Sequence, residues 1–263
     1  MSTIVKKQNK LLYVALVSLF VNLVLLVVLV YVACVKTDFS GRFFAKMGLS
    51  SYSSIDLQHY YQFHCLEGWA NTFEKMRVES DIVFFGNSIT YESDFQKYFP
   101  KLRISNLGCN GDDLDDLIYR SFIIERFHPH KIFVLGGING LVDISIEEFE
   151  KKYAILIEKI KKQSPNAELF LQSILPVNVN MEIGARYNGC QDKIKKANDI
   201  ISLLAQKANC YYIDLYSAYE INDSLPRQYT RDGLHLYPDA YSRWAHVISP
   251  YLMDESNLNK KTP

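Results

Sequence analysis

Two kinds of hydrophobic segment alternate along the chain from residue 82 to residue 251. Short apolar runs bounded by turn residues are typical of strands buried in a parallel sheet, whereas longer segments with one apolar side are typical of amphipathic helices. Strands are predicted at residues 82–85, 102–106, 131–135, 168–174 and 210–215. Helices are predicted directly after the turn at 86–88 and at residues 112–126, 144–162, 191–207 and 238–251. This alternation predicts an α/β fold of right-handed βαβ units, with a parallel sheet covered on both faces.

The predicted helix over residues 144–162 has the clearest boundaries. Ser145, with Glu148 three residues later, forms the pattern of a capping box, and Pro165 follows the end of the helix. Its apolar stripe consists of Phe149, Tyr153, Leu156, Ile157 and Ile160.

The longest hydrophobic segment runs from Leu11 to Val35, with no charged residue before Lys36. A helix of this length spans roughly 37 Å at about 1.5 Å per residue, slightly more than a hydrocarbon core of about 30 Å. Secretory signal peptides have a shorter apolar region, so we predict a transmembrane signal anchor at residues 11–35. The alternative is a lipoprotein signal, because Ala33 precedes Cys34 at the end of the run.

Basic residues flank the predicted anchor in nearly equal numbers, so the positive-inside rule alone does not orient it. The short N-terminal tail favours a cytoplasmic location for residues 1–10 and export of the large C-terminal part. We therefore expect a single-pass membrane protein whose folded domain is extracytoplasmic. Residues 36–54 are predicted as a juxtamembrane linker, residues 55–254 as one domain with a helix within 56–76, and residues 255–263 as a polar tail.

The charge balance narrows the class of partner. The chain has 29 basic and 29 acidic residues, and this balance argues against a nucleic-acid-binding protein, which usually carries a basic excess.

The turn Gly86-Asn87-Ser88, directly after the first predicted strand, is the first candidate for chemistry. Ligands of open α/β sheets bind outside the carboxyl ends of the strands, so a hydroxyl group at this position is well placed. The alternative is that Ser88 only caps the helix that follows, as serine commonly does.

Three more loops are expected at the same edge of the sheet. Residues 106–112 follow the second predicted strand, residues 136–140 follow the third, and the segment Arg231-Asp-Gly-Leu-His235 precedes the last helix. Each loop alone is common, because glycine-rich turns and Asp-initiated caps occur in many folds.

Taken together, in this order and at these distances from the strands, the loops resemble the four blocks of the SGNH, or GDSL-type, esterase and lipase family. The resemblance covers residues 78–252. The matching residues are Gly86-Asn87-Ser88-Ile89, Gly108, Gly137-Ile138-Asn139, Asp232-Gly233-Leu234-His235, Ser173-Ile174-Leu175-Pro176 and Tyr212-Ile213-Asp214. Asn87 replaces the family's usual Asp beside the nucleophile, and Gly140 replaces the Asp that often follows the third-block Asn. These two departures leave the subfamily and the substrate open.

The resemblance implies a three-layer α/β/α sandwich with a parallel, flavodoxin-like five-stranded sheet. A serine hydroxyl group is a weak nucleophile, so it needs a base within hydrogen-bond reach and a third group that orients the base. Ser88 is the candidate nucleophile, His235 the candidate base and Asp232 the candidate acceptor of the imidazole proton. The resemblance assigns the oxyanion hole to the backbone amides of Ser88 and Gly108 and the side-chain amide of Asn139. Neither a metal nor an organic cofactor is expected.

The resemblance also implies the activity of a membrane-anchored serine esterase. The expected substrates are short acyl esters, O-acetyl groups on carbohydrates in particular, cleaved through an acyl-serine intermediate. Hydrolysis of lysophospholipids or thioesters and O-acyl transfer to a cell-envelope sugar are alternatives. From a different class, a non-catalytic glycan-binding module would have no chemical need for Ser88, Asp232 and His235. The pocket walls are expected in the loops at 91–92 and 178–188.

The remaining histidines and cysteines are expected to have no role in the chemistry. His128 and His130 precede the third strand, away from the predicted site, and His246 is expected on a helix surface. The cysteines beyond the anchor do not have metal-site spacing, and disulfide pairing in an exported domain cannot be read from the sequence. They are Cys65, Cys109, Cys190 and Cys210.

Overall fold

The computed structural model describes residues 18, 22 and 79–252. The chain divides into two compact units, Met1–Cys65 and Leu66–Pro263, and the following description concerns the second. Apart from Ser18 and Asn22, the predicted signal anchor lies outside the described residues, as do the linker, the helix within 56–76 and the polar tail. Within the part of the chain that is described, no helix is both long and apolar enough to cross a membrane.

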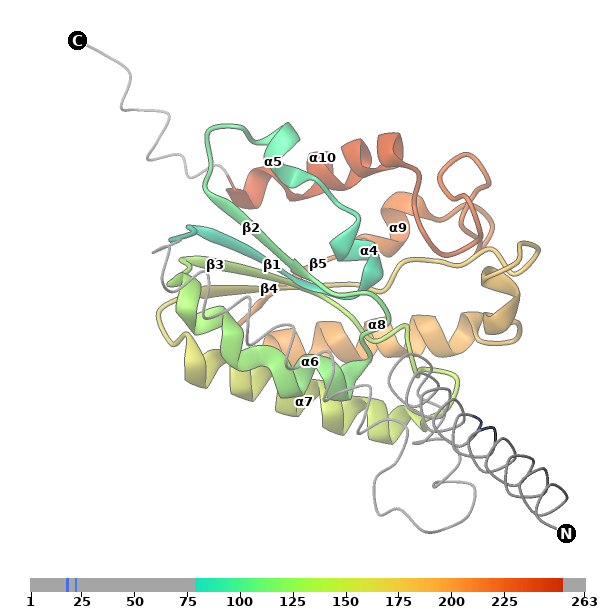
Figure 1. Cartoon of the computed structure of the whole chain (residues 1–263), viewed down its shortest axis with the longest axis horizontal. Helices are drawn as coiled ribbons and strands as arrows, with labels where there is room; N and C mark the ends of the chain where they lie inside the picture. The colour runs from blue at the N-terminus through green and yellow to red at the C-terminus, as the bar shows by residue number, and fades with distance from the viewer. Residues whose placement is uncertain (1–17, 19–21, 23–78, 253–263) are drawn as a thin grey trace, which may run out of the picture. The chain divides into compact units, whose positions relative to one another are not determined.

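A parallel sheet of five strands lies at the centre of the described unit (Figure 1). The strands are β1 Ile82–Gly86, β2 Ile104–Gly108, β3 Lys131–Leu135, β4 Glu168–Gln172 and β5 Tyr211–Ile213, in the order β2-β1-β3-β4-β5. This is the flavodoxin-like order, in which the chain reverses direction across the sheet between β1 and β3. The predicted α/β fold and parallel sheet are confirmed, and the two strands at this switch point carry the loops after Gly86 and Leu135.

Helices cover both faces of the sheet. In Figure 1, α6, α7 and α8 lie on one face, while α5 and α10 lie on the other. The helical segments are α4 Ser88–Tyr91, α5 Phe95–Tyr98, α6 Leu114–Arg120, η1 Ser121–Phe127, α7 Ile146–Gln163, η2 Gly184–Tyr187, α8 Gln191–Lys207, α9 Tyr216–Tyr219, η3 Pro238–Ala240 and α10 Tyr241–Leu252. The long helices follow the predicted periodicity because their apolar stripes face the sheet.

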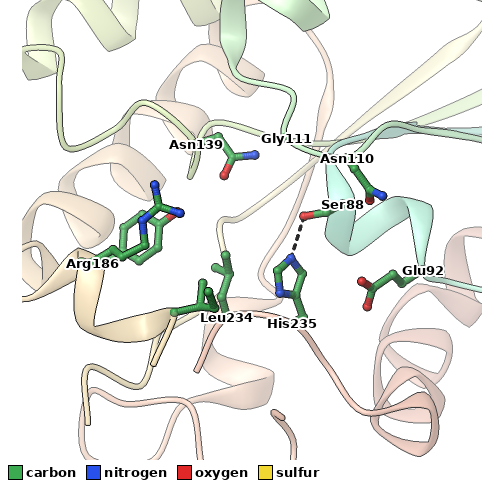
Figure 2. Close-up of a pocket in the computed structure, with 10 residues that line it drawn as sticks. Ser88, Glu92, Asn110, Gly111, Asn139, Arg186, Leu234 and His235 are labelled. Carbon is green, nitrogen blue, oxygen red and sulfur yellow. Dashed lines mark hydrogen bonds between the residues drawn. The ribbon is translucent and has the colours of Figure 1, made fainter. Parts of the chain in front are cut away.

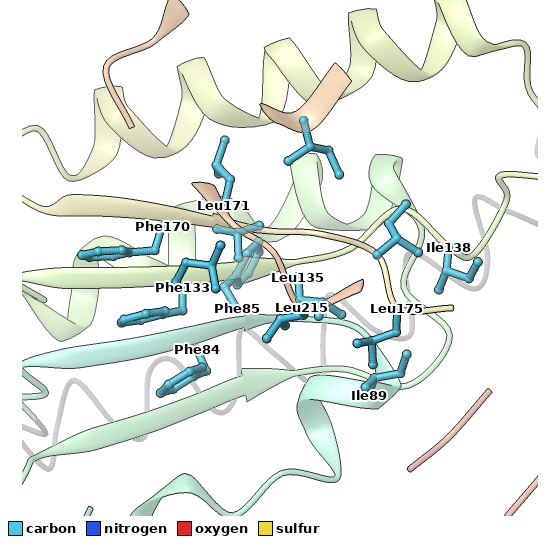
Figure 3. Packing of buried hydrophobic residues seen from close by; sticks show 14 of the residues in the cluster. Phe84, Phe85, Ile89, Phe133, Leu135, Ile138, Phe170, Leu171, Leu175 and Leu215 are labelled. Carbon is cyan, nitrogen blue, oxygen red and sulfur yellow. The ribbon is translucent and has the colours of Figure 1, made fainter. Parts of the chain in front are cut away.

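Aromatic side chains cross one face of the sheet from strand to strand (Figure 3). Phe84 stacks on Phe133 with ring centroids 4.9 Å apart, and Phe133 stacks on Phe170 at 4.5 Å. Tyr211 continues the row beyond Phe170 at 4.7 Å. These residues are paired in register across β1, β3, β4 and β5, so the parallel register itself brings the rings together. Such stacking adds stability beyond the burial of apolar area.

Several predicted boundaries were wrong, and the reasons are local. The predicted helix at 112–126 starts two residues later, because Asp113 caps α6 and forms a reciprocal capping box with Asp116. After Arg120 the chain tightens into the 3-10 helix η1. The predicted strand at 168–174 ends at Gln172, because the Ser173 hydroxyl group accepts hydrogen bonds from the backbone beyond β5.

The predicted cap of α7 is only half formed. The Ser145 hydroxyl group accepts a hydrogen bond from the Glu148 amide at 3.1 Å. The Glu148 carboxylate pairs instead with Lys152 one turn later, at 3.0 Å. The i,i+4 ion pair on the helix surface therefore replaces the second bond of the capping box.

Truncation of the aromatic row should destabilise the fold. Phe133 is fully buried and stacks on two neighbours, so Phe133→Ala should lower the free energy of unfolding by about 3–5 kcal/mol. Urea denaturation monitored by near-UV circular dichroism measures this loss. The control is Ile155→Ala on the outer side of α7, which should cost under about 1 kcal/mol because Ile155 is 45% exposed. Equal losses in the two variants would contradict the role of the row.

Candidate active site

Ser88 is the first residue of the short helix α4, immediately after β1. Asn87 is the N-cap of this helix, because its Oδ1 accepts a hydrogen bond from the Ile89 amide at 3.0 Å. The alternative role of Ser88 as the cap is therefore wrong, and its hydroxyl group is available for another partner. That partner is His235, whose Nε2 lies 3.0 Å from Ser88 Oγ (Figure 2).

Asp232 holds the other side of the His235 ring. Its Oδ2 lies 2.7 Å from Nδ1 of His235, and its Oδ1 accepts hydrogen bonds from the amides of Leu234 and His235 at 3.0 and 2.8 Å. Burial raises the pKa of Asp232, but these hydrogen bonds outweigh it, so the pKa lies below its ordinary value. An ionised carboxylate at Nδ1 keeps the proton on that nitrogen and leaves Nε2 as an acceptor for the Ser88 hydroxyl proton. The structure thus brings the three predicted residues into one hydrogen-bonded chain.

The loop that carries Asp232 and His235 is closed by its own hydrogen bonds. Thr230 Oγ1 donates to the His235 carbonyl at 2.7 Å and accepts from the Gly233 amide at 2.9 Å. Gly233 has a φ of 95°, and a Cβ atom there would lie 2.5 Å from the Asn178 carbonyl oxygen. The loop conformation therefore requires glycine at this position.

Asn139, in the loop after β3, lies across the cavity mouth from His235 (Figure 2). Its Nδ2 donates to the Asp112 carbonyl oxygen at 2.9 Å. An amide nitrogen carries two protons, so this bond orients the group and leaves one proton for a ligand.

The structure does not place Gly108 where the predicted oxyanion hole needs it. Its amide donates to Asn106 Oδ1 at 2.8 Å, and Gly108 is not among the residues that line the cavity. Glycine is needed here for packing, because a Cβ atom would lie 2.1 Å from the Tyr91 amide nitrogen.

Gly111, three residues later, does line the cavity beside Ser88 and Asn139. Its φ of 83° explains why this position is glycine. Within the described residues, neither the Gly111 amide nor the Ser88 amide donates a hydrogen bond to the protein. The sequence signal for Gly111 was present, since a second glycine stands before the aspartates that begin α6, but the prediction took the first.

A buried ion pair fixes this loop to the sheet. Arg120 Nε donates to Asp112 Oδ2, and both side chains are almost completely buried. The same guanidinium group donates to the carbonyl oxygens of Leu107 and Gly86, each at 2.7 Å, and lies over the Phe85 ring. Burial raises the pKa of the Asp112 carboxyl group, and Arg120 opposes that rise. One side chain thus ties the ends of β1 and β2 to the loop whose carbonyl group orients Asn139.

The cavity beside Ser88 has a volume of about 340 Å³ and a mixed lining. The lining residues are Ser88, Glu92, Asn110, Gly111, Asn139, Ile183, Arg186, Tyr187, Leu234 and His235. The predicted loops at 91–92 and 178–188 contribute four of these residues, so that prediction is confirmed. The volume of the cavity is near the lower end for ligand pockets, which suits a small group next to Ser88.

None of the remaining candidates within residues 79–252 is among the residues that line the cavity. His130 is exposed beside Asp81 at the amino end of β3, with 3.7 Å between its Nδ1 and a carboxylate oxygen. Burial raises the pKa of the Cys109 thiol to about 12, so this group stays protonated and is a poor nucleophile. Cys109, Cys190 and Cys210 are free thiols. In residues 79–252, no three His, Cys, Asp or Glu side chains are grouped so as to hold a metal.

Comparison with known proteins places these features in context. A sequence profile of the GDSL-like Lipase/Acylhydrolase family matches residues 84–243. No curated protein sequence matches the chain significantly.

Solved structures share the fold over most of their length. A presumed platelet activating factor from Streptococcus pneumonia is 25% identical, with a TM-score of 0.62 over 74% of this chain and 99% of that one. A GDSL-like lipase from Bacteroides thetaiotaomicron is 21% identical, with a TM-score of 0.57 over 65% and 86% of the two chains. An acetyl xylan esterase from Geobacillus stearothermophilus is 17% identical, with a TM-score of 0.53 over 65% and 93%.

Removal of the buried cation should destabilise the protein strongly. Arg120→Met leaves the Asp112 carboxylate buried without its counter-charge, and we expect a loss of about 3–5 kcal/mol in unfolding free energy. The matched control is Arg103→Met, which breaks an exposed pair with Asp81 and should cost under about 1 kcal/mol. Urea denaturation of both variants makes the comparison. If Arg120→Met is no less stable than the control, the pair does not brace the loop.

Proposed function

Because this chain belongs to the GDSL-like lipase/acylhydrolase family and is an ester-bond hydrolase, we propose that it cleaves short acyl esters, above all O-acetyl groups on carbohydrates, through an acyl-serine intermediate. The observation that carries the proposal is the hydrogen-bonded chain from Ser88 through His235 to Asp232, open to a small cavity with a mixed lining. We further propose that the apolar run from Leu11 to Val35 anchors the enzyme in a membrane, with the catalytic domain outside the cytoplasm.

In the first half-reaction, Ser88 Oγ bonds to the ester carbonyl carbon while its proton passes to His235 Nε2. The electron pair of the carbonyl double bond moves to the oxygen, which becomes an oxyanion. Asp232 stabilises the imidazolium that forms and keeps its ring in place. The ester C–O bond then breaks, His235 returns the proton to the departing alcohol oxygen, and the acyl group remains on Ser88.

In the second half-reaction, a water molecule takes the place of the alcohol. His235 Nε2 accepts a proton from this water as its oxygen attacks the acyl carbon. The tetrahedral intermediate collapses, the bond to Ser88 Oγ breaks, and His235 returns the proton to the serine. The products are the free acid and an unmodified enzyme.

Both tetrahedral intermediates need hydrogen-bond donors at the oxyanion. We assign this role to the amides of Ser88 and Gly111 and to the second Nδ2 proton of Asn139. Two of these donors come from the backbone, and Asn139 is already oriented by the Asp112 carbonyl oxygen. Donors held in place before the reaction stabilise the developing charge without reorganisation.

The cavity supports a short acyl group and a hydrophilic alcohol. Its small volume leaves little room for a long acyl chain, and Glu92, Asn110 and Asn139 offer hydrogen-bond partners for sugar hydroxyl groups. The acetyl xylan esterase that shares the fold acts on an acetylated carbohydrate, as its name states.

The decisive experiment is ester hydrolysis by the full-length chain in a mild detergent, beside Ser88→Ala. Turnover of para-nitrophenyl acetate, butyrate and octanoate should fall steeply with chain length, because the cavity of about 340 Å³ holds only a small acyl group. Ser88→Ala should lose at least about a thousandfold in kcat. Absence of Ser88-dependent turnover on every ester would refute the esterase proposal. Acetate release measured with and without added sugar acceptors separates hydrolysis from transfer.

Removal of one oxyanion donor should slow the chemical step. Asn139→Ala should lower kcat by about a hundred- to a thousandfold while KM changes little, because the donor acts mainly on the charged intermediate. Steady-state kinetics on para-nitrophenyl acetate measure both constants. A matched control is Asn209→Ala, outside the cavity lining, which should leave both constants unchanged. A change confined to KM in Asn139→Ala would assign Asn139 to substrate binding instead.

A further inference from the structure

The charged side chains that line the cavity differ in whether they have a bonded partner. Besides His235, the charged lining side chains are Glu92 and Arg186. Glu92 is neutralised by Arg231, which forms two hydrogen bonds to its carboxylate at 2.6 and 2.7 Å. Across residues 79–252, by contrast, no hydrogen bond or ion pair engages the Arg186 side chain. Among the described residues that line the cavity, Arg186 is therefore a cation without a bonded counter-charge.

Arg186 is carried by a segment that is firmly attached to the catalytic loop. The amides of Ile183 and Gly184 both donate to the Asp232 carbonyl oxygen, at 2.9 and 3.1 Å. The Asn178 amide donates to the Gly233 carbonyl oxygen at 2.8 Å. The Asn178 backbone approaches Gly184 so closely that a Cβ atom on Gly184 would lie 1.9 Å from the Asn178 carbonyl oxygen. The position of η2, and so of the Arg186 backbone, is thus fixed relative to Asp232 and His235.

The place of Arg186 indicates which part of a substrate would meet it. Figure 2 shows Arg186 across the cavity from Ser88, away from the end where Asn110 and Gly111 lie. An acetyl group bound at Ser88 ends at its methyl carbon, so a group that reaches Arg186 belongs to the alcohol. A guanidinium group binds carboxylates through two parallel hydrogen bonds, and a carboxylate takes less of the small cavity than a phosphate does.

We propose that Arg186 is a specificity residue for an acidic alcohol, and that the natural substrate is an acetylated sugar that carries a carboxylate, of the uronic acid type. This inference rests on the proposed function of the Ser88 site. It also explains why Glu92, the only carboxylate among the described residues that line the cavity, is neutralised by Arg231: an unpaired carboxylate there would repel the same substrate. The charge of exposed Asp143 acts on Tyr187, but no ion pair in the described residues joins Asp143 to Arg186, so the Arg186 side chain is available to a ligand.

Binding to the full-length Ser88→Ala protein tests the inference without any need for turnover. The probes are acetylated glucuronate and acetylated glucose, each acetylated at the same hydroxyl group, measured by titration calorimetry at low salt. The glucuronate should bind about tenfold more tightly, and added salt should reduce this preference because the cation is exposed. Addition of Arg186→Gln should abolish the preference, and Arg186→Lys should restore part of it. Arg227→Gln, an exposed arginine outside the cavity lining, is the matched control and should retain the preference.

Hydrolysis by the protein with Ser88 intact provides the second readout. The ratio of kcat/KM for glucuronate over glucose ester should fall about tenfold in Arg186→Gln, through KM. Equal affinities for the two probes in the Ser88→Ala protein would overturn the inference even if esters are hydrolysed. Tighter binding of acetylated glucose phosphate than of the glucuronate would overturn the assignment to a carboxylate. Failure of the esterase proposal itself appears separately, as loss of Ser88-dependent turnover on both sugars.

Discussion

The geometry of the site depends on a single buried ion pair, Asp112 with Arg120. A buried charge pair is costly to desolvate, and it is tolerated only when its remaining donors and acceptors are satisfied. The guanidinium group of Arg120 is satisfied by the carbonyl oxygens of Gly86 and Leu107, whereas Asp112 Oδ1 is buried without a hydrogen-bond partner in the described part of the chain. These carbonyls lie at the ends of β1 and β2, so the pair connects the strand that leads to Ser88 with the loop that contains Gly111. Through the Asp112 carbonyl oxygen it also reaches Asn139 on the third strand end.

The ion pair of Asp112 with Arg120 gives a physical reason for one departure from the family pattern, the replacement of Asp by Asn87. Asn87 is fully buried, and its Oδ1 caps α4 as an aspartate would. An aspartate would add a second buried negative charge next to Gly86, whose carbonyl group already shares Arg120 with Asp112. The neutral amide keeps the cap without that charge, although its Nδ2 is buried without a hydrogen-bond partner in the described part of the chain.

The sequence allowed the class of fold and the three residues that now lie in one hydrogen-bonded chain to be predicted. The strands were visible because both faces of a parallel sheet are buried, which makes segments such as 82–85 continuously apolar. Ser88 and His235 were identified because the loops that carry them, taken together and in order, resemble the blocks of the SGNH family. The N-terminal anchor and the catalytic roles of Ser88, Asp232 and His235 stay predictions.

Features that depend on contacts distant in sequence could not be predicted. Gly108 and Gly111 are both glycines in one loop, and only the packing of Tyr91 against the first and the positive φ of the second distinguish them. The pairing of Arg120 with Asp112 was hidden because an arginine within a helical pattern ordinarily lies on its exposed side. Arg186 carried no signal, since its place beside the cavity depends on the loop of Asp232 and Gly233, to which its segment is bound.

The attachment of the η2 segment to the loop of Asp232 separates two features that often change together: the positions of Asp232 and His235, and the side chain that lines the cavity at position 186. The backbone from Asn178 to Gly184 is held by the loop of Asp232 and Gly233, and Gly184 admits no side chain. Two residues further on, the side chain at position 186 lines the cavity and forms no hydrogen bond with this segment in the described part of the chain. An evolving lineage, or a designer, can therefore exchange that side chain while Asp232 and His235 keep their positions. On the proposal made above, such an exchange would change the preferred alcohol and leave the proposed chemistry as it is.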